Sequence, residues 1–598
     1  MDSTATPITE VMLQANELSA QGENAAAIQR YQDWLASPAN ETQHHYIALF
    51  NMGVILRSIG QTDAAISAYR TALKQRPDFY QAAVNLGLAL ESQGQVQEAL
   101  DTWQNALQPI EAQTLLLNHQ GRALEDAKNL AAAESKLAQS LHLQPNQPDA
   151  IQHYFHLRQK QCEWPIIHTL PGLSDTDLLN SFGPLGLLAL TDDPAIQRQA
   201  VQTWVNRKIP PNLPRLSPTA GYNHQRLRIG YLSGDFRWHA VSILTAELFE
   251  LHDRNQFEIY GIDFSVDDGG EMRKRVLRAM DHHLPIHGLS DEQAAQCIAE
   301  HEIDILIDLT GLTAGSRYKI LAYKPAPIQI AYLGFIGTSG IAQMDYILVD
   351  RFVFPEQLAA YYVEKPLYLP EVYQVNDSQR VIGATPDKAA CGLPADSFVY
   401  CSFNGSYKIT PEVFAVWMRI LQRTPHSVLW LVADNRWAQA NLIQQAQNHH
   451  IDPARLIFAE RVAPADYLAR YRVADLLLDT SPYNAGTTAS DALWAGLPVL
   501  TCPGRTFASR MAGSLLNAVG LTELIAPNWL AYENKAVQLA AESAAESAAE
   551  SATELTAYKR RLHATARSSP LFDSARFVKN FEQTLKFAVQ NTQLQQNF

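Results

Sequence analysis

The sequence predicts an α-helical repeat superhelix followed by two doubly wound α/β lobes. Glycines recur with a 34-residue period near the start of the chain, at Gly53, Gly87 and Gly121. Beyond the proline-rich segment KIPPNLPRLSP (208–218), short apolar runs alternate with helical stretches in two successive sets. Helix pairs that repeat at a fixed period stack into a superhelix, and alternating strands and helices form parallel sheets with both faces covered.

The composition is that of a folded protein with several domains. The chain has 598 residues, 47% hydrophobic and 18% charged, so two to four domains are expected. A net charge of −14, without a block of lysine and arginine, argues against nucleic acid or an anionic membrane as the main partner. Five scattered cysteines indicate a reducing compartment. No apolar run approaches the ~18 residues of a membrane span, and the start of the chain does not resemble a signal peptide, so we expect a cytoplasmic protein.

The first predicted element is a repeat array over roughly residues 10–150, within a domain of residues 1–160. Further positions also recur after 34 residues: Gly60 and Gly94, Tyr69 and Trp103, Ala72 and Ala106. This pattern resembles the tetratricopeptide repeat, whose concave face commonly holds extended peptides. Asn51 and Asn85 occupy equivalent positions, and an amide both donates and accepts hydrogen bonds, so we expect them to guide a peptide; a solvated inner face is the alternative. Such arrays often self-associate, which leaves a homo-oligomer open.

A helical and proline-rich linker (161–225) is predicted before the two lobes, which we place at 226–385 and 386–598. The first set of strands begins at LRIGYLSGDF and the second at FVYCSFNG. Ligands of such sheets bind beyond the carboxyl ends of the strands, so we expect a cleft there. The Ala-Glu-Ser repeat near residues 541–552 is expected to form an exposed helix extension, and no chemistry is inferred from it.

The stretch DLLLDTSPYNAGTTASDALWAGLPV predicts a strand, a loop and the start of a helix. Thr488 and Asp491 have the spacing of a capping box. Gly486 would let the backbone approach a ligand closely, while Thr487 and Thr488 add hydroxyl donors. A helix N-terminus has free N–H groups and a partial positive charge. The sequence therefore predicts a diphosphate site here, with a plain helix cap as the alternative.

Residues 226–525 resemble the catalytic region of the O-linked N-acetylglucosamine transferase/SPINDLY family. The matching words are IGYLSGDFRWHAVS, DLTGLTAGSRYKILAYKPAPIQIAYLGFIGTSG, YCSFNGSYKITPEVFAVWMRIL and the stretch quoted above with its continuation. Repeats precede this region in the family too. The resemblance implies an inverting glycosyltransferase of the GT-B type that requires no metal and no cofactor. Its nucleotide-sugar donor would be UDP-N-acetylglucosamine, and its acceptors would be serine and threonine hydroxyls of proteins.

The resemblance also implies roles for single residues. His239 matches a histidine proposed as general base or as a residue that positions sugar and acceptor. Lys408 matches the lysine that contacts the phosphates of the leaving group. Asp491 matches the position that binds the ribose, and Ala463 lies in the segment whose backbone contacts the base. Further donor contacts are implied at Gly405, Gly486, Thr487 and Thr488. The acceptor and sugar side of the cleft is expected at Thr310, Gly311, Gly334, Gly337 and Thr338.

Departures from the family leave the donor open. Gly486-Thr487-Thr488 stands where many members have His-Thr-Thr, whereas the SPINDLY branch, which uses GDP-fucose, and many bacterial relatives have Gly-Thr-Thr. UDP-N-acetylglucosamine is therefore the leading donor, and GDP-fucose or another nucleotide sugar is the first alternative. A repeat scaffold that binds nucleotide sugars without transferring them is the second.

Overall fold

The computed structural model describes residues 6–40, 42–106, 110–546 and 553–596, and the chain divides into two compact units. The first unit holds the residues up to Leu157 together with His168–Asp175. The second unit holds Arg158–Ile167 and everything from Thr176 onward. The sequence placed residues 161–225 in a linker, whereas the structure places most of that stretch within the second unit.

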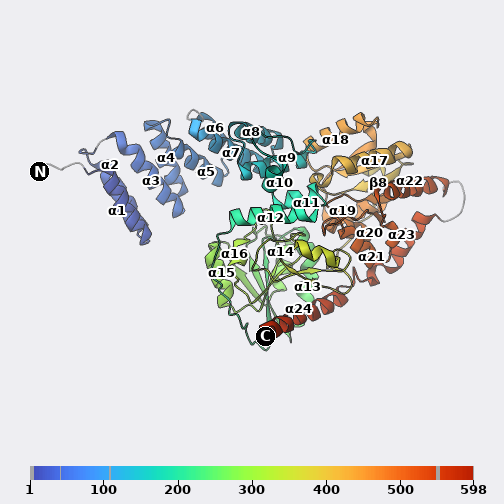
Figure 1. Cartoon of the computed structure of the whole chain (residues 1–598). Coiled ribbons are helices and arrows are strands. Elements are labelled where there is room, and N and C mark those ends of the chain that lie inside the picture. The colour runs from blue at the N-terminus through green and yellow to red at the C-terminus, as the bar shows by residue number, and fades with distance from the viewer. Residues whose placement is uncertain (1–5, 41, 107–109, 547–552, 597–598) are drawn as a thin grey trace. The chain divides into compact units, whose positions relative to one another are not determined.

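The first unit is a series of consecutive helix pairs, coloured blue to teal in Figure 1. Its 34-residue period has a packing cause. A Cβ on Gly53 would lie 2.6 Å from Tyr69 Cε1, and one on Gly87 would lie 2.1 Å from Trp103 Nε1. The glycine of one helix therefore gives room for the buried ring of the next. The helices are α1 (Ile8–Ala20), α2 (Asn24–Ala36), α3 (His45–Ser58), α4 (Thr62–Gln75), α5 (Tyr80–Ser92), α6 (Val96–Asn105), α7 (Ile110–Asp126), α8 (Leu130–Leu143) and α9 (Pro148–Gln161).

Three helices precede the two lobes in the sequence: α10 (Asp175–Ser181), α11 (Pro184–Leu190) and α12 (Pro194–Lys208). Between α11 and α12, the carboxylate of Asp192 accepts hydrogen bonds from the backbone N–H groups of Arg505 and Thr506. On α12, Arg198 donates to the backbone carbonyl of Ala360. The segment predicted as a linker is thus an integral part of this unit.

The first lobe is a seven-stranded parallel sheet in the order β3-β2-β1-β4-β5-β6-β7. Its central strands are buried and mostly apolar because helices cover both faces, whereas the edge strand of residues 282–285 is largely exposed. The elements are β1 (Leu227–Ser233), α13 (Ala240–Leu251), β2 (Phe257–Asp263), α14 (Glu271–Arg278), β3 (His282–Pro285), α15 (Asp291–Glu300), β4 (Ile305–Asp308), α16 (Lys319–Ala322), β5 (Ile328–Ala331), β6 (Tyr346–Val349) and β7 (Lys365–Tyr368).

The second lobe is a five-stranded parallel sheet in the order β10-β9-β8-β11-β12. Its elements are β8 (Phe398–Ser402), α17 (Pro411–Arg423), β9 (Ser427–Val432), α18 (Arg436–Asn448), β10 (Leu456–Ala459), α19 (Pro464–Arg470), β11 (Leu476–Leu478), α20 (Thr487–Ala495), β12 (Val499–Leu500), α21 (Met511–Ala518), α22 (Trp529–Glu546) and α23 (Glu554–Thr565). In both sheets the strand order reverses at the first strand of the lobe, β1 or β8, and crevices for ligands form beside such a reversal.

The last helix, α24 (Ser574–Gln596), packs on the first lobe against α13, β5 and β7, although the sequence assigned it to the second (Figure 1). Buried Phe581 and the carboxylate of Glu582 hold it there, the latter bonded to His252 Nδ1 at 3.0 Å and to the Asp253 N–H at 2.8 Å. Residues 547–552, the second half of the Ala-Glu-Ser repeat, lie outside the described residues; the first half extends α22 to Glu546.

Candidate active site

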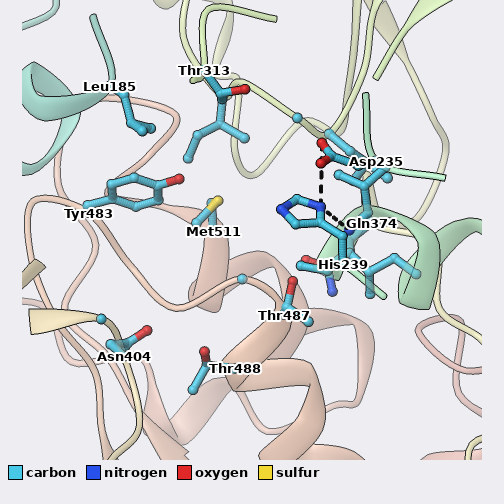
Figure 2. Close-up of a pocket in the computed structure, with 18 of the residues that line it drawn as sticks. Leu185, Asp235, His239, Thr313, Gln374, Asn404, Tyr483, Thr487, Thr488 and Met511 are labelled. Atoms are coloured by element: carbon cyan, nitrogen blue, oxygen red, sulfur yellow. Dashed lines mark hydrogen bonds and ion pairs between the residues drawn. The ribbon is translucent and has the colours of Figure 1, made fainter. Parts of the chain in front are cut away.

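A cavity of about 500 Å³ lies between the two sheets of the second unit, at the carboxyl ends of their strands. The loop after β1 contributes one wall, the turn after β8 another, and the loop between β11 and α20 a third. Figure 2 shows His239 and Asp235 on one side, and Asn404, Tyr483 and Thr488 on the other. The lining includes Asp235, Arg237, His239, Thr313, Gly334, Gln374, Asn404, Gly405, Lys408, Tyr483, Gly486, Thr487, Thr488 and Met511.

His239 stands at the start of α13 and its ring faces the cavity. Its Nδ1 accepts the backbone N–H of Val241 at 3.3 Å and lies 3.5 Å from Asp235 Oδ2 (Figure 2). Desolvation lowers the pKa of His239, which the Asp235 carboxylate opposes and the Arg237 guanidinium reinforces. Because Nδ1 accepts a hydrogen bond, the neutral ring carries its proton on Nε2. In this arrangement Nε2 is a hydrogen-bond donor.

Lys408 ends the short 3-10 turn η4 (Ser406–Lys408) that follows β8. Its ammonium donates to the backbone carbonyl of Asn484 at 3.0 Å and lies 3.8 Å from the centre of the Tyr483 ring, a cation–π contact. Desolvation lowers its pKa to about 8, and the carboxylate of Asp479 opposes that shift. The amine is therefore still mainly an ammonium at neutral pH, and it brings a positive charge to the cavity wall.

Helix α20 begins at the cavity with Thr487, after Gly486 as N-cap residue. The predicted capping box is wrong, because the helix starts one residue before Thr488 and no side chain caps it. Within the described part of the chain, no group accepts the backbone N–H of Thr487 or Thr488. These N–H groups, the two threonine hydroxyls and Lys408 together provide the donors and positive charge that an anion requires.

Asp491 and Ala463, predicted at the ribose and the base, are not among the residues that line the cavity. Asp491 is 6% exposed and forms an ion pair with the guanidinium of Arg380, in the segment that connects the lobes. Burial raises the pKa of Asp491, and Arg380 opposes that rise. Ala463 is exposed and precedes α19 as its N-cap residue. Their contacts with a donor stay predictions.

Of the five residues predicted on the acceptor and sugar side, Gly334 lines the cavity. The others are not among the lining residues. Thr310 Oγ1 accepts the Gly234 N–H at 3.1 Å, and Thr338 Oγ1 donates to Glu364 at 2.8 Å. Gly311 packs against Phe335, and Gly337 is buried beside the same ring.

The lining residues that the sequence interpretation did not predict include Asp235, Gln374 and Tyr483. Asp235 stands four residues before His239, a spacing that suggests a carboxylate–imidazole pair across the turn into a helix. Gln374 and Tyr483 carry no comparable signal, because a glutamine and a tyrosine in loops have many alternative roles.

The two asparagines predicted to guide a peptide lie on α3 and α5 of the first unit. Asn51 and Asn85 are half-buried, and neither side-chain amide bonds to another described residue. Their capacity for hydrogen bonds remains available, and the peptide-guiding role stays a prediction.

Among the described residues, no group of three or more His, Cys, Asp or Glu side chains could hold a metal ion. None of the helices described is both long enough and apolar enough to cross a membrane.

Comparison with known sequences identifies both regions. The model of a family described as glycosyl transferase family 41 matches residues 214–391 and 378–581, and a tetratricopeptide-repeat model matches residues 50–114. A probable UDP-N-acetylglucosamine–peptide N-acetylglucosaminyltransferase SEC of Arabidopsis thaliana is 38% identical over 367 residues, 60% of this chain and 37% of the relative. A UDP-N-acetylglucosamine–peptide N-acetylglucosaminyltransferase of Caenorhabditis elegans is 28% identical, over 61% of this chain and 41% of the relative.

A SPINDLY relative from Petunia hybrida, named as a probable enzyme of the same kind, is 29% identical over 65% of this chain and 40% of its own. The matches thus span well under half the length of these curated relatives. Among solved structures, a mutant of the Thermobaculum terrenum O-GlcNAc transferase superposes with a TM-score of 0.68 at 24% identity, covering 93% of this chain and 99% of that one. This likeness confirms the predicted fold class of helical repeats followed by a GT-B glycosyltransferase.

Proposed function

Since the chain belongs to glycosyl transferase family 41, we propose that it transfers N-acetylglucosamine from UDP-N-acetylglucosamine to serine or threonine hydroxyls of proteins. The membership confirms the family resemblance read from the sequence motifs. The observation that carries the proposal is one cavity in which Lys408 and the open start of α20 face the wall that bears His239.

The second lobe supplies what a departing diphosphate needs. When the bond between the sugar C1 and the phosphate oxygen breaks, negative charge grows on that oxygen. The Lys408 ammonium and the N–H and hydroxyl groups of Thr487 and Thr488 are placed to stabilise this charge. We propose that they do so without a divalent ion, in a role that a metal fills in other transferases.

The first lobe supplies the acceptor side. The acceptor oxygen attacks C1 from the face opposite the diphosphate, so a single displacement inverts the configuration at C1. As the C–O bond to the acceptor forms, the hydroxyl proton leaves. His239 donates from Nε2 in its neutral form and so orients a sugar or acceptor oxygen. To act as base instead, Nε2 must be unprotonated and Nδ1 protonated, a form that the nearby Asp235 carboxylate favours but that gives up the bond from Val241.

The test is a panel of nucleotide sugars with the full-length protein. We expect UDP-N-acetylglucosamine to be hydrolysed slowly and transferred to a peptide acceptor, with β-linked product as seen by NMR. Turnover should persist in EDTA. Loss of turnover on chelation, with recovery in manganese, would refute the proposed metal independence. Absence of binding by any nucleoside diphosphate would refute the site itself.

GDP-fucose is the second donor to test, because of Gly486. This glycine has no side chain at the donor end of the cavity, and its added Cβ would come within 3.4 Å only of Gln374 and Met511. No side chain at this position restricts the choice of nucleotide sugar. If GDP-fucose is the faster donor, the chemistry proposed here holds and the donor assignment changes.

The repeats are proposed to guide protein acceptors. Replacing both Asn51 and Asn85 with alanine should raise KM for a protein acceptor while leaving donor hydrolysis unchanged. Equal losses in both reactions would contradict a peptide-guiding role.

A further inference from the structure

The loop of residues 480–485, between β11 and α20, contacts the side chain of Lys408 and holds it in place. Two of its groups hold the ammonium: the backbone carbonyl of Asn484 and the ring of Tyr483. The next residues along the chain are Gly486 and the start of α20. The shape of this loop therefore sets both the lysine and the helix start that face a donor.

Asp479 closes this loop at its two ends. It is the residue after β11, and its side chain is 1% exposed. Oδ1 accepts the N–H of Thr480 at 2.8 Å, at the beginning of the loop, and the N–H of Ala485 at 2.7 Å, at the end. Oδ2 accepts the hydroxyl of Thr501, beyond β12, at 2.6 Å. One carboxylate thus joins both ends of the loop to the neighbouring strand.

Asp479 is also an acidic group whose charge raises the pKa of Lys408. Around the Lys408 ammonium lie the Asn484 carbonyl, the Tyr483 ring and the charge of Asp479. The ring of Tyr407, the residue before Lys408, packs edge-on against Tyr483. Asp434, on the loop after β9, instead accepts bonds from the backbone N–H and hydroxyl of Ser406. Burial raises the pKa of Asp479 to about 7, while its three hydrogen-bond donors and Lys408 favour the carboxylate. Between pH 7 and 8 the carboxylate and the ammonium coexist.

We propose that Asp479 is a positioning residue for Lys408. It fixes the 480–485 loop and compensates the positive charge of Lys408 beside the cavity. The proposal rests on the proposed function, in which Lys408 stabilises the diphosphate. Asp479 itself is not among the residues that line the cavity. It acts through the carbonyl and the ring that hold the amine.

Asp479→Asn is the main variant, because asparagine keeps an oxygen for the two backbone N–H groups and removes the charge. Asp475→Asn is the matched control: this residue lies at the other end of β11, and its carboxylate also accepts a backbone N–H, from Val399 at 2.9 Å. Thr501→Val removes the third hydrogen bond and leaves the charge in place. These three substitutions separate charge, loop geometry and general loss of stability.

The first readout needs no turnover. Competitive acylation of the full-length protein with acetic anhydride from pH 6 to 10, followed by mass spectrometry of the Lys408 peptide, gives the midpoint at which this amine loses its proton. We expect Asp479→Asn to move the midpoint to lower pH by about one unit, since a lost neighbouring carboxylate disfavours the ammonium. Asp475→Asn and Thr501→Val should keep the wild-type midpoint.

The second readout is donor hydrolysis. Asp479→Asn should lower kcat at pH 8 about fivefold with a smaller change in KM, because about half of the wild-type lysines and about one-tenth of the variant's are then charged. An unchanged midpoint in a folded Asp479→Asn variant, or an equal shift in Asp475→Asn, would overturn the proposal. If the midpoint shifts but the wild type turns over no nucleotide sugar, the positioning role stands and the proposed function falls.

Discussion

Raising the pH through 8 should remove most of the sugar-transfer activity, because Lys408, the amine proposed to stabilise the departing diphosphate, then loses its charge. Desolvation in the cavity wall places the pKa of Lys408 at about 8. The charged fraction is then about nine-tenths at pH 7, one-half at pH 8 and one-tenth at pH 9. If only the ammonium supports departure of the diphosphate, the rate at saturating donor should fall about tenfold between pH 7 and pH 9.

The assay is the initial rate of UDP release from saturating UDP-N-acetylglucosamine between pH 6 and 9.5, with circular dichroism at each pH to show that the fold persists. Lys408→Arg is the matched variant, since a guanidinium keeps its charge throughout this range. Its residual rate, reduced by the altered geometry, should show no alkaline decline. A wild-type rate that is flat or rising up to pH 9, or an equal decline in Lys408→Arg, would refute the reasoning.

Three further predictions concern the histidine, the buried ion pair and the repeats. His239→Ala should lower kcat about 100-fold without lowering the melting temperature by more than a few degrees; wild-type turnover in a peptide-transfer assay would contradict its role. Arg380→Ala should destabilise the second unit by about 3–5 kcal/mol, because Asp491 is left buried without its partner; calorimetry measures this, and an unchanged transition would show that Asp491 rearranges freely. Gly87→Ala should cost about 1–3 kcal/mol through overpacking against Trp103, seen as an earlier calorimetric transition of the repeats with donor hydrolysis unchanged; an unshifted transition would contradict the close packing.

Local patterns were enough to predict the repeats and the sheets. The 34-residue period records a glycine that must sit against the ring of a following helix, as Gly87 does against Trp103. The apolar runs became strands because both faces of each parallel sheet are covered. In both cases the information lies within a few dozen residues, where sequence spacing and spatial proximity coincide.

Contacts between distant segments could not be predicted in the same way. Arg380 pairs with Asp491, 111 positions later, and His252 bonds to Glu582, 330 positions later. A charged residue has many candidate partners at such separations, and no repeat period in the sequence indicates which of them it contacts. The same reason explains why α24 was assigned to the lobe that precedes it in the sequence rather than to the lobe on which it packs.

The start of α20 shows how a local rule fails at the proposed anion site. The Thr488–Asp491 spacing predicted a capping box, but Gly486 adopts the N-cap position, and Asp491 is held by Arg380. The conformation before the helix is instead set by Asp479, which binds the N–H of Ala485. A side chain at the N-cap would occupy the N–H groups that a diphosphate needs, so the missing cap is consistent with the proposed anion site.

The residues predicted at the phosphate end and at the base end of a bound donor carry different amounts of information about which donor binds. In the proposed function, Lys408 and the first residues of α20 act on the diphosphate. Every nucleoside diphosphate sugar carries this group, so their role would be the same whichever base is bound. Discrimination between bases requires polar groups that match the base edge. The side chain of Ala463 offers no such polar group. A backbone contact there would discriminate between bases by the positions of their hydrogen-bonding groups and not by their size.

Asp491, the residue expected at the ribose, already bonds to Arg380. A donor that binds there must share or displace this ion pair, and Arg380→Ala should therefore change the affinity for UDP far more than the affinity for inorganic pyrophosphate, which has no ribose. Equal changes in the two affinities, measured by calorimetry on the folded variant, would place the ribose elsewhere.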